Sequence, residues 1–191
     1  MPALKYRENV EDVKDKPVFG VDDLVKRGVP RDYAKTLLYR LNKRDEISRI
    51  ERNKYTAREN PMAVAPYLTH PSYLSLWTSL RFHNVTQQSP FTVEVVTSRS
   101  RYNREIDFKG TKIRFYEVKP KMMFGYAYEV YEKDRIPIAS PEKALVDGMY
   151  LNVIPMEEVE AVVSGLDEKK LEDYAARAGA GVKSKIEEVR G

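Results

Sequence analysis

Residues 29–56 carry the strongest structural signal in the N-terminal part of this chain; they read VPRDYAKTLLYRLNKRDEISRIERNKYT. Within this stretch Ala34, Leu37, Leu38 and Leu41 recur at intervals of three and four residues. At about 3.6 residues per helical turn, this spacing places the four side chains on one buried stripe. Pro30 suits the first turn of such a helix. The stretch therefore predicts an amphipathic helix.

The opposite face of this predicted helix carries polar and basic side chains. Thr36, Tyr39 and Lys43 lie across from the apolar stripe, and Lys35 and Arg40 flank them. Such side chains can donate hydrogen bonds to base edges and to phosphates, which indicates a DNA-reading surface. The residues of this helix that we predict to bind DNA are Arg31, Lys35, Thr36, Tyr39, Arg40 and Lys43.

A β-hairpin is predicted directly after the helix. Residues 46–52 alternate Ile47 and Ile50 with polar positions, and Asn53-Lys54 precedes the extended pair Tyr55-Thr56. Its basic side chains add three predicted DNA contacts, at Arg49, Arg52 and Lys54.

Two shorter helices are predicted before residue 29. Val21, Leu24 and Val25 form the apolar side of a brief helix that ends at Gly28, as in the first half of a helix-turn-helix. Residues 1–16 carry scattered apolar positions, at Leu4, Tyr6, Val10 and Val13, that suit a first helix. The order of helix, turn, helix and hairpin predicts a winged helix-turn-helix domain over residues 1–60. Two alternatives are a helical domain with a merely solvated basic face and a winged helix used for protein contacts.

Length and charge indicate two domains and a polyanionic partner. The chain has 191 residues, of which the predicted winged helix needs about a third, and the polar segment 57–61, ARENP, marks the boundary. Residues 1–60 hold 15 Lys and Arg against 11 Asp and Glu, and residues 61–121 hold 9 against 4. Residues 122–191 hold 9 against 14. The basic surface is therefore expected in the first two thirds of the chain, although charge does not choose between DNA and RNA.

Several classes of site lack support in the sequence. There is no cysteine, and His70 and His83 alone cannot build a zinc centre, so we expect no metal and no cofactor. Neither a nucleotide-binding glycine loop nor a nucleophile elbow nor a zinc-protease motif is present. No apolar run reaches membrane-span length, and the N-terminus lacks the apolar core of a signal peptide. We expect a cytoplasmic protein without catalytic residues.

Residues 61–191 are predicted to form a domain of helices and a mainly antiparallel sheet. Tyr73, Leu76, Trp77 and Leu80 have helical spacing and predict a core helix that starts at Pro71, with His83 capping or packing near its end. Four or five strands should follow, including residues 91–97, a hairpin in which Ile106 and Phe108 oppose Ile113 and Phe115, and residues 124–131 and 135–139. The whole chain is thus predicted to be α+β.

Helices return after the predicted sheet. Ser140 suits an N-cap and Pro141 a first turn, with Ala144, Leu145, Gly148 and Met149 on the inner face of a helix that runs to about Leu151. Residues 156–166, 167–178 and, more weakly, the last twelve residues are predicted to be helical.

A basic loop in this second domain is a candidate functional surface. It contains Arg99, Arg101, Tyr102 and Arg104. These side chains could contact a protein or an RNA, which would make the chain an interaction module, or they could simply be solvated.

An enzymatic alternative is a metal-dependent nuclease. Asp107 and the triplet Glu117-Val118-Lys119 resemble the D…ExK arrangement, in which two carboxylates hold a divalent metal and the lysine orients water or stabilises charge. The pattern is loose, because strand ends commonly carry solvated Glu and Lys. We expect these residues to be structural.

Taken together, these segments resemble the AbiEi antitoxin family over nearly the whole chain. The resemblance lies in the predicted winged helix, in YLSLWTSLRFHNVTQQSP at 73–90, in the basic turn at 99–104 and in IASPEKALVDGMYL at 138–151. It implies a transcriptional regulator of viral defence that binds inverted repeats at its own promoter. It also implies an antitoxin of a type IV toxin–antitoxin pair, whose partner is a nucleotidyltransferase-like toxin and whose C-terminal domain is associated with antitoxicity.

Overall fold

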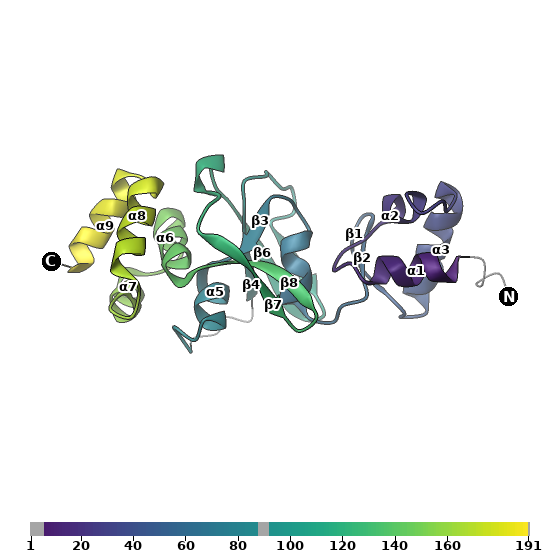
Figure 1. The fold of residues 1–191 in the computed structure, drawn as a ribbon, viewed down its shortest axis with the longest axis horizontal. Coiled ribbons are helices and arrows are strands. Elements are labelled where there is room, and N and C mark those ends of the chain that lie inside the picture. Colours follow the sequence, from purple (N-terminus) through teal and green to yellow (C-terminus); the bar gives the residue numbers. More distant parts are fainter. Residues whose placement is uncertain (1–5, 88–91, 191) are drawn as a thin grey trace. The chain divides into compact units, whose positions relative to one another are not determined.

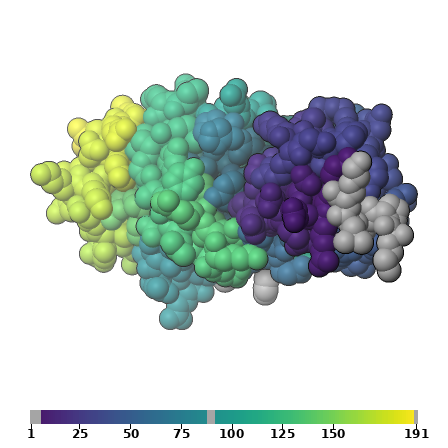
Figure 2. All heavy atoms as spheres, turned by 45° about the vertical axis from the view of Figure 1, so that its right-hand side comes forward, coloured from purple at the N-terminus to yellow at the C-terminus, as the bar shows by residue number. Residues whose placement is uncertain are grey.

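The computed structural model describes residues 6–87 and 92–190. Within these ranges helices accompany a mixed β-sheet, so the chain is α+β, as predicted. Leu4, the end of the 73–90 segment and the start of the predicted strand at residue 91 lie outside the described residues. The chain divides into two compact units, Met1–Leu68 and Thr69–Gly191, which the colours of Figure 2 separate into purple to blue and teal to yellow. The boundary between these two units follows Leu68, whereas the sequence prediction placed a domain boundary after residue 60.

The first unit contains helices and one two-stranded antiparallel sheet (Figure 1). Its elements are α1 (Arg7–Lys14), α2 (Val21–Val25), α3 (Arg31–Lys43), β1 (Ser48–Glu51), β2 (Lys54–Thr56), α4 (Pro61–Val64) and the 3-10 helix η2 (Ala65–Tyr67).

The core of the first unit holds the apolar residues that the sequence indicated. Leu24 of α2 and Ala34 and Leu38 of α3 are completely buried, as is Val13 of α1. Gly28 has a φ of 85°, which lets the chain turn between α2 and α3 at a backbone conformation that other residues adopt rarely. The predicted stripe of α3 is thus confirmed, with Leu37 only partly buried at its edge.

The β1–β2 hairpin is attached to the helices at two places. Phe19 and Tyr55 exchange two backbone hydrogen bonds, which adds a bridge beside β2. Arg58 is buried, and its guanidinium donates to the carbonyl oxygens of Lys14 and Asp15 at the end of α1. The segment 57–61, predicted to be a polar boundary, therefore closes the end of a helix.

The second unit is built on a sheet that has six strands within the described residues, in the order β5-β6-β4-β3-β8-β7. Two of its pairings, β3 with β8 and β4 with β6, are parallel, and the others are antiparallel. The described part of the sheet therefore has more strands than the expected four or five. The strands are β3 (Ser72–Leu74), β4 (Thr92–Thr97), β5 (Glu105–Phe108), β6 (Thr111–Glu117), β7 (Tyr126–Tyr131) and β8 (Asp134–Ala139).

The missed strand is β3, which the prediction placed inside a helix. Tyr73 and Leu74 are extended, Ser75 continues the extended backbone, and helix α5 (Leu76–Phe82) begins only afterwards. Both faces of β3 are buried, so its residues are apolar or small without alternation. A short apolar run of this kind cannot be distinguished from a buried helix by periodicity, which explains the error.

Helices pack against the sheet and close the unit (Figure 1). They are α6 (Pro141–Leu151), α7 (Met156–Val163), α8 (Glu168–Ala178) and α9 (Ala180–Arg190), and the 3-10 helix η3 (Pro120–Met122) follows β6. The Ser140 hydroxyl accepts a hydrogen bond from the Lys143 backbone N–H, as predicted for an N-cap. One core joins Tyr73 and Val96 of the sheet to Leu145 of α6, Leu171 of α8 and Ile186 of α9.

Candidate nucleic-acid interface

Helix α3 presents one exposed face that carries the predicted DNA-reading residues. Thr36, Tyr39, Arg40 and Lys43 are all exposed, on the side of α3 away from buried Ala34, Leu38 and Leu41. Tyr39 is 59% exposed, unusual for a large aromatic side chain, and the Lys43 ammonium lies 5.8 Å from the centre of its ring. Because the opposite side of α3 is anchored in the core, this face must point into solvent.

The cations of this face differ in how strongly the protein already engages them. The Arg31 guanidinium is 2.6 Å from the Asp22 carboxylate, and the Lys35 ammonium is 3.1 Å from that of Asp32. Among the described residues, the Arg40 guanidinium has neither an ion pair nor a hydrogen bond. Arg40 is thus better placed than Arg31 and Lys35 to accept a new anionic partner.

Asp32 is a member of this face that the sequence reasoning left out. It lies four residues before Thr36 and three before Lys35, so it shares their side of the helix. Its carboxylate is almost wholly exposed, and its backbone carbonyl accepts the Thr36 hydroxyl at 3.0 Å. A carboxylate here lowers the positive charge of the face and can accept a hydrogen bond from a cytosine amino group. The spacing of three residues between Asp32 and Lys35 was a signal in the sequence that the two side chains lie on the same side of the helix.

The β1–β2 hairpin supplies two further exposed cations beside α3. The Asn42 side-chain oxygen accepts the backbone N–H of Arg49 at 2.8 Å, which ties β1 to the end of α3. Arg49 also donates from Nε to the Glu51 carbonyl, whereas exposed Arg52 lies in the turn before Asn53, whose φ is 59°.

Lys54 was predicted to lie exposed at the tip of the hairpin, but the structure shows it partly buried. Its ammonium is 2.7 Å from the Glu51 carboxylate and donates to the Leu68 carbonyl, and the side chain is about one third exposed. Lys54 therefore connects β2 to the end of its own unit and offers little to a phosphate.

A charged pair fixes the turn that precedes α2. Burial opposes ionisation of Asp23, but the Lys16 ammonium, 2.5 Å away, and the Gly20 N–H together lower the pKa of this carboxyl below its usual value. Asp23 thereby caps the first turn of α2, the helix against which α3 packs.

The basic loop of the second unit is mostly engaged with the protein itself. Arg99 donates from Nε to the His70 carbonyl, and the Arg101 guanidinium lies over the Phe115 ring, 3.9 Å from its centre. Arg104 is exposed, with its guanidinium 3.8 Å from the Glu117 carboxylate, and Tyr102 is fully exposed. The three arginines therefore do not form one solvated patch.

The structure separates the residues of the nuclease pattern. Asp107 pairs with Lys112 across the β5–β6 ladder and accepts the Gly110 N–H in the connecting turn. Glu117 lies five residues further along β6, about 16 Å at strand spacing, and an odd offset puts it on the other face of the sheet. Two carboxylates so placed cannot share one metal ion. In the described ranges there is also no group of three or more His, Asp and Glu side chains that could hold a metal.

Two buried ionisable features were missed by the sequence reasoning. Glu94 of β4 is 3% exposed; burial raises its pKa to about 7, although the backbone N–H groups of Trp77 and Thr78 and the Tyr116 hydroxyl favour its ionised form. On α6, Lys143 and Asp147 are fully buried together, and Asp147 also accepts the hydroxyls of Tyr73 and Ser75. A carboxylate inside the apolar strand 92–97 and the i, i+4 Lys–Asp spacing inside an apolar helix were the available signals.

Comparison with known proteins adds no assignment. No protein-family model matches this chain, and no curated protein matches it. The resemblance to the AbiEi family therefore stays a prediction from the sequence motifs. In the part of the chain that the structure describes, no helix has the length and apolar character that crossing a membrane requires.

Proposed function

We propose that the first unit is a winged helix-turn-helix domain that binds duplex DNA with sequence preference, and that the chain is a transcriptional regulator repressing its own promoter. α2 and α3 take the helix-turn-helix positions, α3 is the recognition helix, and the β1–β2 hairpin is the wing. The operator is expected to contain inverted repeats.

One observation supports this proposal above the others. The exposed face of α3 combines an exposed guanidinium at Arg40, an ammonium at Lys43, a hydroxyl at Thr36 and an exposed ring at Tyr39, all on a helix held by its opposite side. A major groove about 12 Å wide admits a helix in this orientation, with such donors aimed at base edges and phosphates.

Gel shifts with the DNA upstream of the chain's own reading frame test this proposal. We expect a shifted complex that survives an excess of unrelated duplex and weakens as salt rises, because neutralised phosphates release counterions. Arg40→Ala should abolish the preference for the upstream DNA, whereas Lys169→Ala, which removes the same charge from an exposed position of α8, should not. Folded protein that gives no shift at low salt would exclude the proposal.

We further propose, on the resemblance alone, that the regulator is the antitoxin of a type IV pair of the AbiEi kind. A nucleotidyltransferase-like reading frame should then lie immediately downstream of its gene. Induction of that frame in a heterologous host should stop growth, and coexpression of this chain should restore it. Growth arrest that the chain does not relieve would remove the antitoxin role without affecting the DNA-binding proposal.

A further inference from the structure

A cleft in the second unit combines aromatic rings with basic side chains. Its volume is about 710 Å³, and it opens between the end of β6 and the end of α6. The residues that matter here are Arg104, Arg114, Tyr116, Lys119, Tyr150 and Leu151.

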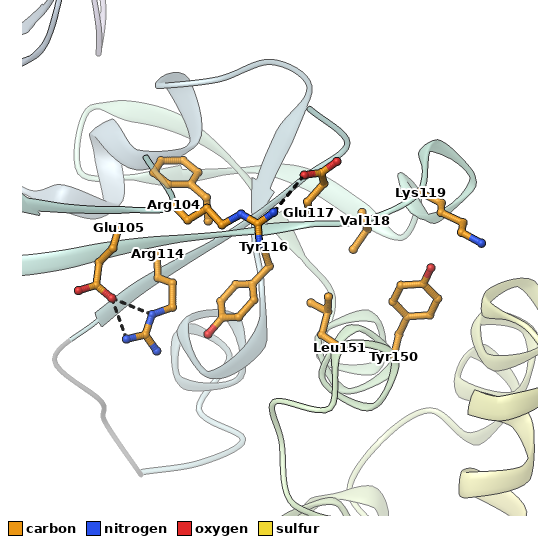
Figure 3. Close-up of a pocket in the computed structure, with 10 residues that line it drawn as sticks. Arg104, Glu105, Arg114, Tyr116, Glu117, Val118, Lys119, Tyr150 and Leu151 are labelled. Atoms are coloured by element: carbon orange, nitrogen blue, oxygen red, sulfur yellow. Dashed lines mark hydrogen bonds and ion pairs between the residues drawn. The ribbon is translucent and has the colours of Figure 1, made fainter. Parts of the chain in front are cut away.

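The middle of this cleft is mainly apolar. Figure 3 shows the rings of Tyr116 and Tyr150 on either side of Leu151, and all three side chains are partly buried and pack against the core of the unit. Val118, which is buried, completes the apolar lining. The Tyr116 hydroxyl donates a hydrogen bond of 3.4 Å to the Glu94 carboxyl, which helps to fix the orientation of this ring. Rings anchored in this way offer a preformed stacking surface to a planar ligand.

The rim of the cleft carries more positive than negative charge. Glu105 binds Arg114 through two hydrogen bonds of 3.1 and 2.8 Å and also binds Lys112 at 2.8 Å, so two cations share one carboxylate. Arg104 meets Glu117 only at 3.8 Å, with both side chains well exposed. Such an exposed pair is weak, so Arg104 can exchange Glu117 for a stronger anion.

Lys119 is the cation of the cleft that is least engaged. It is exposed, it lies beyond Tyr150 in Figure 3, and among the described residues its ammonium has no ion pair and no hydrogen bond. A phosphate at this rim would gain Lys119 at one end of the cleft or Arg104 at the other without displacing a strong interaction.

From this arrangement we infer that the cleft binds a nucleotide, with the base against Tyr150 or Tyr116 and the phosphate at the cation beside that ring, Lys119 or Arg104. A planar aromatic ring joined to an anion is the chemistry that a stacking surface with a basic rim recognises. The nucleotide is either a free nucleoside phosphate or one unit of a single-stranded RNA. This site is separate from the duplex-binding face of α3, and its existence does not depend on DNA binding by the first unit.

Calorimetric titrations of the full chain with ATP, GTP, CTP, UTP, a short single-stranded RNA and an oligoglutamate peptide test the inference. We expect saturable binding of at least one nucleotide or of the RNA, and no binding of the peptide. Binding of mononucleotides identifies a free nucleoside phosphate as the ligand, whereas binding of RNA alone identifies the strand. Tyr150→Leu or Tyr116→Leu should weaken binding about tenfold, as loss of one stacked base does, and Lys119→Ala or Arg104→Ala, at the cation beside that ring, should weaken it by a similar factor.

Matched variants control for stability and for total charge. Tyr128→Leu removes an exposed tyrosine from β7, and Lys169→Ala removes an exposed lysine from α8; neither residue lines the cleft. Both should bind like the unchanged protein. The inference is wrong if no nucleotide or RNA binds at millimolar concentration, if only the acidic peptide binds, or if the control variants lose as much affinity as the cleft variants.

Discussion

The ammonium of Lys143 contacts the carboxylate of Asp147 one turn further along α6, and neither side chain is exposed to solvent. Burial lowers the pKa of Lys143 and raises that of Asp147, while their mutual contact opposes both changes. The Lys143 ammonium also lies 4.3 Å from the centre of the Phe124 ring. The pair thus connects α6 to the sheet and to the segment after η3.

Loss of Asp147 should destabilise the second unit more than loss of Lys143. Asp147→Ala removes the carboxylate partner of the Lys143 ammonium and of the Ser75 and Tyr73 hydroxyls, of which Tyr73 keeps the Met122 carbonyl, whereas Lys143→Met leaves Asp147 with both hydroxyl donors. Removing one partner of a buried ion pair lowers the free energy of unfolding by about 3–5 kcal/mol. We expect Asp147→Ala to lower it by an amount in this range. Urea unfolding measures the difference. Equal stability of Asp147→Ala and the unchanged protein would contradict this view of the pair.

Glu94 should make stability depend on pH. Its pKa is raised from an ordinary 4.5 to about 7 in the folded chain, so between these values the folded state binds more protons than the unfolded state. The contribution of Glu94 to the free energy of unfolding is therefore fully present below the ordinary pKa of 4.5, and it is lost as the pH rises through the folded-state pKa of about 7. Glu94→Gln should remove this part of the decline and be more stable than the unchanged protein above pH 7. Denaturation curves of the variant and of the unchanged protein, recorded at several pH values across this range, measure the two stability profiles. A variant whose stability falls with pH as it does in the unchanged protein would show that Glu94 does not cause the decline.

We expect no metal-dependent nuclease activity from Asp107, Glu117 and Lys119. Asp107 of β5 pairs with Lys112, five residues before Glu117 on β6, so the two carboxylates lie on opposite faces of the sheet and one ion cannot bridge them. Incubation with DNA and with RNA in the presence of magnesium or manganese measures any cleavage. Cleavage that disappears in a folded Glu117→Ala protein would refute this expectation.

Substitution of the basic loop should spare operator binding. Arg101 lies over Phe115, and the Arg104 guanidinium faces Glu117. Both arginines belong to the second unit, whereas α3 belongs to the first. Arg101→Ala and Arg104→Ala are therefore expected to bind the upstream DNA normally. If the proposed antitoxin role is right, the same variants should restore growth less well when the toxin is coexpressed. Gel shifts and growth curves with the same preparations separate the two effects.

Periodicity predicted most elements of this chain, and it failed where burial removes the pattern. α3 was readable from Ala34, Leu38 and Leu41 because one side of this helix faces solvent and the other does not. β3 was not readable, because Tyr73 and its neighbours are buried on both faces. The parallel pairing of β4 with β6 joins strands separated by β5, and no local signal specifies such an order.

The candidate sites were predictable to different extents. The basic face of α3 followed directly from helical geometry, apart from the acidic Asp32. Lys54 was misplaced because its partner, the Leu68 carbonyl, lies fourteen residues away in sequence. The cleft could not be foreseen, since it brings Tyr150 from the end of α6 to Tyr116 of β6, and only the folded sheet places these two together.

Affinity for the upstream duplex and for a scrambled duplex, measured at two salt concentrations, tests whether the exposed face of α3 reads DNA. Thr36→Ala, Tyr39→Ala and Arg40→Ala should each lose discrimination, since a base contact contributes about 1–3 kcal/mol. Arg49→Ala and Arg52→Ala should instead weaken binding to both duplexes and flatten the salt dependence. If the α3 variants discriminate normally while Arg101→Ala and Arg104→Ala abolish binding, DNA recognition does not reside in α3.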